Sequence, residues 1–454
     1  MKRSAWRYLW TAQDVRRKLL ITILILAIYR LVAHVPVPGA NPDVMSALVD
    51  RPGGSGTFVG ILDLLSGGTV SNFSVLAMGV YPYITAQIIL QLLVPIVPAL
   101  QRRMQEDPRE GRVWMEKWTY ILAVPMAALQ AIGQINIFNS LSSQAGLGLV
   151  IENFGLTGGN LLSTLTIVLS MTAGTMFAIW LGELISEFGI RNQGLSLIIF
   201  SGIVSQIPTS ILQLWSDEQY RWFSLIFMVI ITILIIFAIV FVQQGRRNVP
   251  VMYPGRRVGS RMSMPVKGTL PLMVNMAGMI PLIFAQSILT FPAILASYFL
   301  NSETEWVQNF ATAVNNIFGG GHWLYYLLYF LMVVLFSFFY TDVLFSQQNY
   351  GENLKKVGAQ IPGVARGPQT QRYLTKVLRR ITLPGAFFLG LVAVLPFLVG
   401  LILSAFGVNL QNQNSILLVN SAGLLIVVGV VRDTFFTIDA ELKLHGYDET
   451  LLVR

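Results

Sequence analysis

The residues of this chain that could do chemistry are few and widely separated. Its three histidines, His34, His322 and His445, lie far apart and form no His-Glu-x-x-His motif, so no histidine-based zinc site is predicted. The sequence also has no Gly-x-x-x-x-Gly-Lys-Ser/Thr phosphate loop, no Gly-x-Ser-x-Gly motif and no cysteine. A carboxylate-only metal site is left open by these patterns. We predict no catalytic residues, no metal site and no cofactor.

The composition indicates where such a chain resides. Of its 454 residues, 54% are hydrophobic and 12% are charged, about half the roughly 25% charged fraction of a typical soluble protein. Several apolar runs reach the roughly 17 to 25 residues that cross a bilayer core. A soluble multidomain enzyme is therefore excluded, and an all-α polytopic membrane protein is predicted. Its ten expected spans are 19–35, 73–97, 118–138, 161–181, 195–214, 222–242, 270–299, 322–345, 381–405 and 414–431.

The basic residues predict the orientation of these spans. All but three of the 31 Lys and Arg residues fall in alternate connections or in the two ends of the chain, and the exceptions are Arg30, Arg51 and Arg221. The positive-inside rule then places both termini in the cytoplasm. The basic arm 1–18 is either an interfacial helix or disordered, and 432–454 is expected to be a cytoplasmic tail.

Ionisable residues are almost absent from the expected spans. Glu183, Glu187 and Asp342 lie near cytoplasmic ends, where solvated or capping roles are expected of them. Proton or cation relays in coupled transporters usually need charged groups inside the membrane. Energy for any directed work must therefore come from outside this chain.

Two spans carry nearly the same string, 79–90 and 278–289. A chance match between two Leu/Ile-rich helices is the alternative, but hydrophobicity does not explain matched Gly, Pro and Gln. The strings lie five spans apart, so the repeat predicts two inverted halves, 19–214 and 215–431, with a site near the midplane. We expect the matched prolines to bend their helices and the matched glutamines to form a polar seam. The pairs are Gly79 with Gly278, Pro82 with Pro281, Ile84 with Ile283 and Gln87 with Gln286.

Three connections stand out. Segments 243–269 and 346–380 are long and basic, which suits an anionic partner such as ribosomal RNA or an acidic protein surface, although the topology signal alone could explain their charge. The glycine-rich segment 60–72 is too short to cross a bilayer. It fits a re-entrant half-helix or an ordinary outer loop.

Several of these strings resemble the SecY family, whose members form the protein-conducting channel of the bacterial Sec translocon. The resemblance runs through all ten spans. Its motifs are Ile-Leu-Asp-Leu-Leu-Ser-Gly-Gly at 61–68, the second-span string at 72–84, His-Val-Pro-Val-Pro-Gly at 34–39, Gly-Ile-Arg-Asn-Gln-Gly at 189–194, Val-Asn-Met-Ala-Gly-Met-Ile-Pro at 274–281 and Gly-Glu-Asn-Leu-Lys-Lys at 351–356.

The resemblance implies a pore between two five-span halves, closed by an aliphatic ring that can dewet. The ring would be Ile84, Ile88, Leu195, Ile199, Ile283 and Ile426. The plug would be segment 60–72, with Ile61, Leu62, Leu64, Leu65, Ser66, Gly67 and Gly68. A lateral gate for signal sequences and transmembrane segments would be formed by spans 2, 3, 7 and 8, with Gln87, Gln130, Gln286 and Ser287.

The resemblance also implies partners. They are the SecE and SecG subunits, the SecA motor ATPase, the ribosome with its rRNA, signal sequences and nascent polypeptides, and membrane lipid. Docking to the motor or ribosome would fall to Arg256, Arg257, Arg261, Lys355, Lys356 and Arg366. The chain departs from the family pattern at Gly-Ser-Arg 259–261 and Pro-Gly-Val-Ala-Arg-Gly 362–367, which shifts the expected arginines.

We therefore expect a passive channel for unfolded polypeptides in the plasma membrane. An inverted-repeat secondary transporter of a small solute is the alternative, which the near absence of ionisable residues in the spans disfavours. An intramembrane enzyme is disfavoured by the missing nucleophile and metal motifs.

Overall fold

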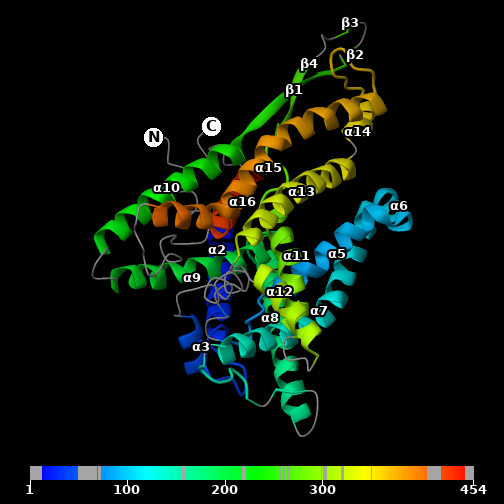
Figure 1. The fold of residues 1–454 in the computed structure, drawn as a ribbon. Helices are drawn as coiled ribbons and strands as arrows, with labels where there is room; N and C mark the ends of the chain where they lie inside the picture. The colour runs from blue at the N-terminus through cyan, green and yellow to red at the C-terminus, as the bar shows by residue number, and fades with distance from the viewer. Residues whose placement is uncertain are drawn as a thin grey trace. The chain divides into compact units, whose positions relative to one another are not determined.

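The computed structural model shows a predominantly helical chain (Figure 1). It describes residues 13–49, 69, 73–144, 146–152, 154–155, 160–191, 193–216, 221–254, 257–258, 261–262, 266–297, 299, 304–318, 322–348, 350–405 and 421–444.

A helix overlaps each of the ten predicted spans. They are α2 (Gln13–Val32), α5 (Tyr81–Ile96), α7 (Pro108–Gln144), α8 (Leu161–Phe188), α9 (Gly194–Ser216), α10 (Arg221–Gln244), α11 (Ile280–Ser297), α13 (Trp323–Gln347), α15 (Pro368–Ala405) and α16 (Ser421–Leu444). The described residues add α3 (Pro42–Val49), α6 (Pro98–Glu106), α12 (Glu305–Phe318) and α14 (Tyr350–Lys356).

Helix α10 illustrates why these segments are helical despite their composition. It is rich in Ile, Val and Phe, which are weak helix formers in water. Within lipid, however, every backbone polar group must find its partner inside the segment, and a helix achieves this. Segment Leu225–Gln244 has a mean hydropathy of 3.5, and most of its residues are not buried within the protein.

Backbone contacts divide the chain into two compact units, one of 1–232, 287–325 and 400–454 and the other of 233–286 and 326–399. In the first unit, α7 packs against α3, α5, α6 and α8, while α8 also contacts α2 and α9. Its core includes an edge-to-face pair of Phe73 and Phe138, with ring centroids 5.7 Å apart.

Glycine allows the close approach of α8 and α9 in this unit. A Cβ built on Gly194 would lie 1.7 Å from the carbonyl oxygen of Gly182, which no side chain could tolerate. The backbone N–H of Gly194 also donates to Oγ of Ser186 at 3.1 Å, which is a second contact between the start of α9 and α8. The tight turn between α8 and α9 therefore depends on this glycine.

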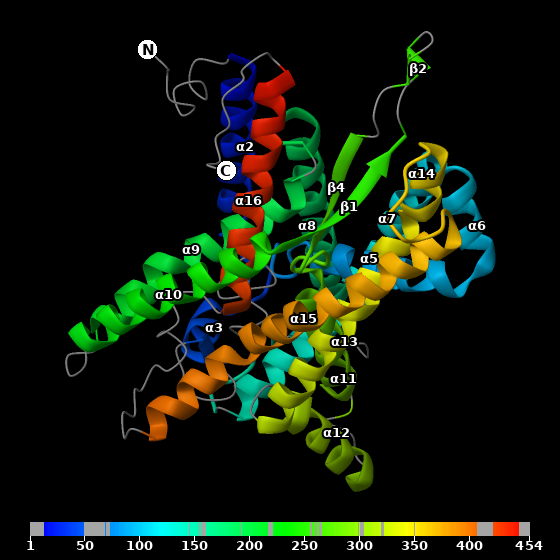
Figure 2. The ribbon, with the colours of Figure 1, turned by 90° about the horizontal axis from the view of Figure 1, so that it is seen from above.

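The second unit contains an antiparallel ladder of β1 (Arg246–Tyr253) and β4 (Val266–Met273). Val249 pairs with Leu270 and Val251 with Gly268, so one face of the ladder is buried and the other exposed, as the two-residue period of a strand requires. The short strands β2 (Arg257–Val258) and β3 (Arg261–Met262) lie beyond this ladder (Figure 1), and Figure 2 shows β2 in the same place.

Two predicted span boundaries were wrong. Segment 270–299 starts as strand β4, and its helix α11 begins only at Ile280. Segment 73–97 starts with turns, and its helix α5 begins at Tyr81. In both cases apolar residues of a strand or turn precede the helix, so hydropathy alone places the start of the span too early.

Candidate functional site

The internal repeat builds the same local structure twice. Gly79 has φ of 51° and Gly278 has φ of 63°, both in the left-handed region that glycine adopts readily. In each copy the helix begins two residues after the glycine, at Tyr81 in α5 and at Ile280 in α11. The matched glycines therefore allow the same left-handed backbone turn just before each helix.

The prediction that the matched prolines bend their helices was wrong. Pro82 lies in the first turn of α5, and Pro281 is the second residue of α11. At these positions a helix has no partner for the backbone N–H, and the fixed φ of proline favours the helical start. The repeat thus conserves a helix start rather than a kink.

The residues predicted for the pore ring lie on four helices. Ile84 is partly buried and Ile88 is buried on α5, one turn apart, and Leu195 and Ile199 have the same spacing on α9. Ile426 is buried on α16, which packs against α9 in the first unit. The sixth residue is Ile283, which is buried on α11 in the second unit. Their convergence on one pore stays a prediction.

Gln130, one of the predicted gate residues, forms a hydrogen bond between two helices. Nε2 of Gln130 on α7 donates to Oγ1 of Thr85 on α5 at 3.3 Å, while Oε1 of Gln130 is buried without a hydrogen-bond partner. Gln87 is partly buried. On α11, Gln286 and Ser287 are both buried.

Thr85 is a candidate gate residue that the sequence analysis missed. Its repeat counterpart is Phe284 on α11, whose ring packs edge-to-face on Phe336 and Tyr340 of α13, at 5.9 and 5.6 Å. The same repeat position thus joins α5 to α7 by a polar contact and α11 to α13 by aromatic contacts. The mismatch of Thr with Phe, one of five between the two twelve-residue strings, was the available signal.

Replacing Gln130 by leucine is expected to change the free energy of unfolding by less than about 1 kcal/mol, because hydrogen bonds between membrane helices average about 0.6 kcal/mol and the unpaired Oε1 is removed. Replacing Thr85 by valine should cost more, about 1 to 3 kcal/mol, since it leaves both amide atoms of Gln130 buried without partners. Thermal unfolding of the two purified variants would measure the difference. A larger loss for Gln130→Leu would contradict the contact as described.

The two long basic segments meet in one framework. The backbone N–H of Met252 in β1 donates to the carbonyl of Gln360 at 2.8 Å, and the reverse bond is 2.9 Å. Beneath this bridge lies a common core, formed by Val249, Val251, Leu272, Phe345, Ala359, Ile361, Leu374, Leu378 and Ile381. We call this assembly of β1, β4, α14 and the first turns of α15 the platform.

The predicted docking residues differ in how firmly the platform holds them. Nε of Arg366 donates to Oε1 of Gln360 at 3.1 Å, and Gln360 is itself paired with β1. Lys356 is 3.6 Å from Glu352 in an exposed i,i+4 pair, which contributes little rigidity. The backbones of Arg257 and Arg261 lie in β2 and β3.

Other predicted site residues lie outside the described part of the chain. These are Arg256 and the plug residues Ile61, Leu62, Leu64, Leu65, Ser66, Gly67 and Gly68. Within the described residues, no group of three or more His, Asp or Glu could hold a metal ion.

Among the described residues, five helices are long and apolar enough to cross a membrane. They lie within Arg109–Ser140, Leu161–Phe188, Leu225–Gln244, Trp323–Lys356 and Pro368–Ile402. A sixth span results if α5 and α6, bent by 95° at their junction, count as one. The chain is thus a multi-pass membrane protein, and crossing by all ten helices stays a prediction.

Known proteins match this chain over nearly its whole length. The chain is 34% identical to the protein translocase subunit SecY of Streptomyces galbus, over 98% of this chain and 99% of that protein. It is 35% identical to the protein of the same name from Aquifex aeolicus, over 97% of both, and 35% to that of Chlamydia muridarum, over 98% of this chain and 97% of the other.

The fold is likewise similar to solved channel structures. A structure of a protein-conducting channel matches with a TM-score of 0.62 at 17% identity, covering 96% of this chain and 95% of the other. A structure reported for the plug domain of SecY and the closed state of its channel matches with a TM-score of 0.61 at 18% identity, with the same coverage. The family model for SecY matches residues 74–435. The chain belongs to the SecY family.

Proposed function

We propose that this chain is the central channel subunit of a Sec protein translocase, passing unfolded secretory polypeptides across the membrane and releasing transmembrane segments into lipid. One observation carries the proposal, the 34 to 35% identity with bacterial translocase subunits over 97 to 98% of the chain. SecY subunits form a channel and are not enzymes, so the function of this chain is gating rather than bond making.

The aliphatic ring of Ile84, Ile88, Leu195, Ile199, Ile283 and Ile426 is the proposed pore waist. Aliphatic side chains form no hydrogen bonds with a passing polypeptide, so they do not select for its sequence and permit many different chains to pass. A narrow apolar constriction also loses water readily, which closes it to ions. Segment 60–72 is the proposed plug on the outer side of this ring.

The proposed lateral gate lies along α5, α7, α11 and α13, the helices of spans 2, 3, 7 and 8. Here the contact between Gln130 and Thr85 is long at 3.3 Å, and Oε1 of Gln130 is unsatisfied. A buried polar group without a partner favours any state in which it gains one. This arrangement supports a seam that opens at small energetic cost.

The platform is the proposed docking surface for the SecA motor and the ribosome, which supply the energy that the uncharged spans do not. The hydrogen bonds that join Arg366, Gln360 and Met252 support it, because a preorganised cation costs less to immobilise on binding. SecE and SecG are the proposed membrane partners. Both termini are proposed to lie in the cytoplasm, where the basic connections also lie.

Reconstitution tests the proposed function. Proteoliposomes holding the full chain with SecE and SecG should protect a secretory precursor from external protease when SecA and ATP are added. A precursor with a disulfide-closed internal loop is the matched control, because a pore for unfolded chains should stall at the loop until a reductant opens it. Precursor protection that does not depend on ATP, or none with all partners present, would contradict the proposal.

A further inference from the structure

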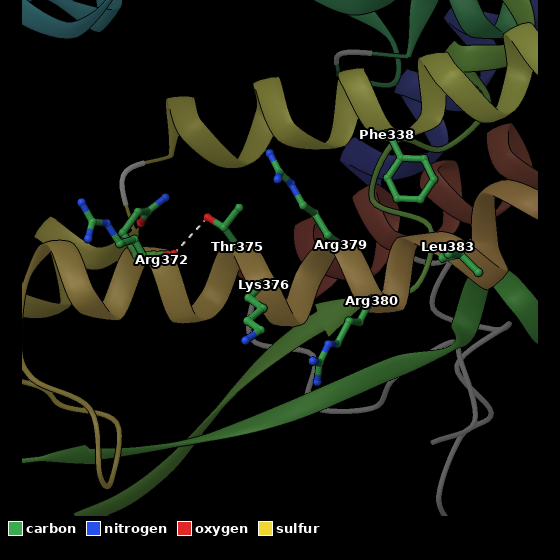
Figure 3. A pocket seen from close by; sticks show the side chains of 8 residues that line it. Phe338, Arg372, Thr375, Lys376, Arg379, Arg380 and Leu383 are labelled. Atoms are coloured by element: carbon green, nitrogen blue, oxygen red, sulfur yellow. Dashed lines mark hydrogen bonds between the residues drawn. The ribbon is translucent and has the colours of Figure 1, made fainter.

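A basic groove of about 560 Å³ lies at the first turns of α15, within the platform but lined by none of the six individual residues predicted for docking. Figure 3 shows Arg379 extending from this helix toward α13, which carries Phe338, whereas Lys376 and Arg380 extend to the opposite side of the helix in this view. The lining residues on which the argument depends are Phe338, Arg372, Lys376, Arg379, Arg380 and Leu383.

Only one cation of the groove has an acidic partner among the described residues. Arg379 forms a two-pronged contact with Asp342 of α13, with Nη2 to Oδ2 at 2.8 Å and Nε to Oδ2 at 3.1 Å. Among the described residues, Arg372, Lys376 and Arg380 form no ion pair with a carboxylate. Within the described part of the chain, the groove therefore holds three cations without an acidic partner beside Arg379, which has one.

These cations share a helical face with exposed apolar residues further along α15. Positions three, four and seven residues apart lie on one side of a helix, so Lys376 and Arg380 are in line with Leu383 and Phe387. Leu383 is 61% exposed and Phe387 is 57% exposed. One continuous face of α15 is thus basic at its start and apolar afterwards.

The apolar part of this surface continues on α13. The ring of Phe330 packs edge-to-face on Phe387 at 5.3 Å, and Tyr326 stacks on Phe397 at 4.3 Å, so the two helices lie side by side below the groove. On α13, Leu331 and Leu335 are more than half exposed. An amphiphile with an anionic head could place its head in the groove and its tails on this surface.

We propose that the groove binds the phosphate headgroup of an anionic phospholipid, whose acyl chains lie along the exposed apolar faces of α15 and α13. Clusters of basic residues at the cytoplasmic ends of membrane helices attract anionic headgroups. That the lipid belongs to the cytoplasmic leaflet rests on the proposed membrane orientation, whereas the binding itself rests on the groove.

Two other occupants fit the groove less well. Inorganic phosphate would use the cations but not Leu383, Phe387 or the exposed leucines of α13. An RNA backbone needs a basic track that stays in water, but this basic face runs directly into an apolar one. A phospholipid uses both parts of the surface.

Native mass spectrometry of the purified full chain with phosphatidylglycerol and phosphatidylcholine tests the proposal. The chain should retain phosphatidylglycerol in preference to phosphatidylcholine. The double variant Lys376→Gln, Arg380→Gln should weaken phosphatidylglycerol retention about tenfold or more, since each cation near an anionic headgroup contributes severalfold. Retention of phosphatidylcholine should not change.

Three matched variants separate the possible explanations. Arg109→Gln with Arg112→Gln removes the same charge from exposed positions of α7 and should leave retention unchanged. Lys376→Arg with Arg380→Lys keeps the charge and should retain the lipid. Leu383→Asn leaves the cations intact, so it should weaken phospholipid retention without affecting the binding of inorganic phosphate.

Equal retention by the wild-type chain and the Lys376→Gln, Arg380→Gln variant would overturn the proposal, as would equal retention of the two lipids. Displacement of phosphatidylglycerol by excess inorganic phosphate, with no effect of Leu383→Asn, would assign the groove to soluble phosphate. Displacement by a short RNA would assign it to nucleic acid. The assay contains no motor or precursor, so failure here leaves the channel function standing.

Discussion

A single cysteine in place of Ile84 or Ile283 is expected to form a disulfide with a secretory chain that carries its own cysteine and is stalled in transit. The native chain has no cysteine, so the introduced thiol is its only reactive one. A disulfide requires Cβ atoms to approach to about 4 Å, so we expect about tenfold more cross-linking at the pore waist than at a position facing lipid.

Phe237→Cys is the control for this experiment. Phe237 lies in the apolar segment Leu225–Gln244 of α10 and is 73% exposed, and most residues of this segment are not buried within the protein. Cross-linking should be weak there throughout translocation. Equal yields at Phe237, Ile84 and Ile283 would remove these two isoleucines from the pore waist.

Deletion of segment 60–72 is expected to raise the ion conductance of the resting channel about tenfold, since an apolar ring without its plug must exclude water and ions alone. Planar bilayer recordings of the reconstituted full chain would measure this. The effect should be largest without a precursor, because a polypeptide in the pore takes over part of the seal.

A replacement variant distinguishes loss of the plug from shortening of the connection. Exchange of segment 60–72 for a Gly/Ser linker of equal length keeps the reach of the chain but removes the apolar plug residues. Both variants should leak. If only the deletion leaks, or if neither does, segment 60–72 is an ordinary outer loop.

The structure shows where hydropathy predicts membrane helices well and where it does not. Helix α10 follows its predicted span, 222–242, closely because an uninterrupted apolar run has only one hydrogen-bonding solution in lipid. The residues that connect strand β4 to helix α11 are mostly apolar, so hydropathy predicts a single span over 270–299. The alternation of Leu270 and Leu272 marks a strand, but a window average conceals it.

The two basic segments show the same limit at the level of the site. Their charges and lengths predicted a surface for an anionic partner, and this stays a prediction. The distance between the two segments in the sequence concealed that Met252 pairs with Gln360 and that six residues of the two segments share a core. Such pairing depends on long-range contacts, for which a single sequence carries no local signal.

The sequence by itself determined the membrane class, the expected orientation and the repeat, because these depend on local composition and on the order of residues along the chain. The tertiary structure decided that the matched prolines start helices, that Gln130 meets Thr85, and that four cations of α15 line one groove together with Phe338 of α13. Each of these depends on which segments approach one another and on which side of a helix faces a neighbour. Those choices are made by packing among distant residues, and the composition of a segment does not encode them.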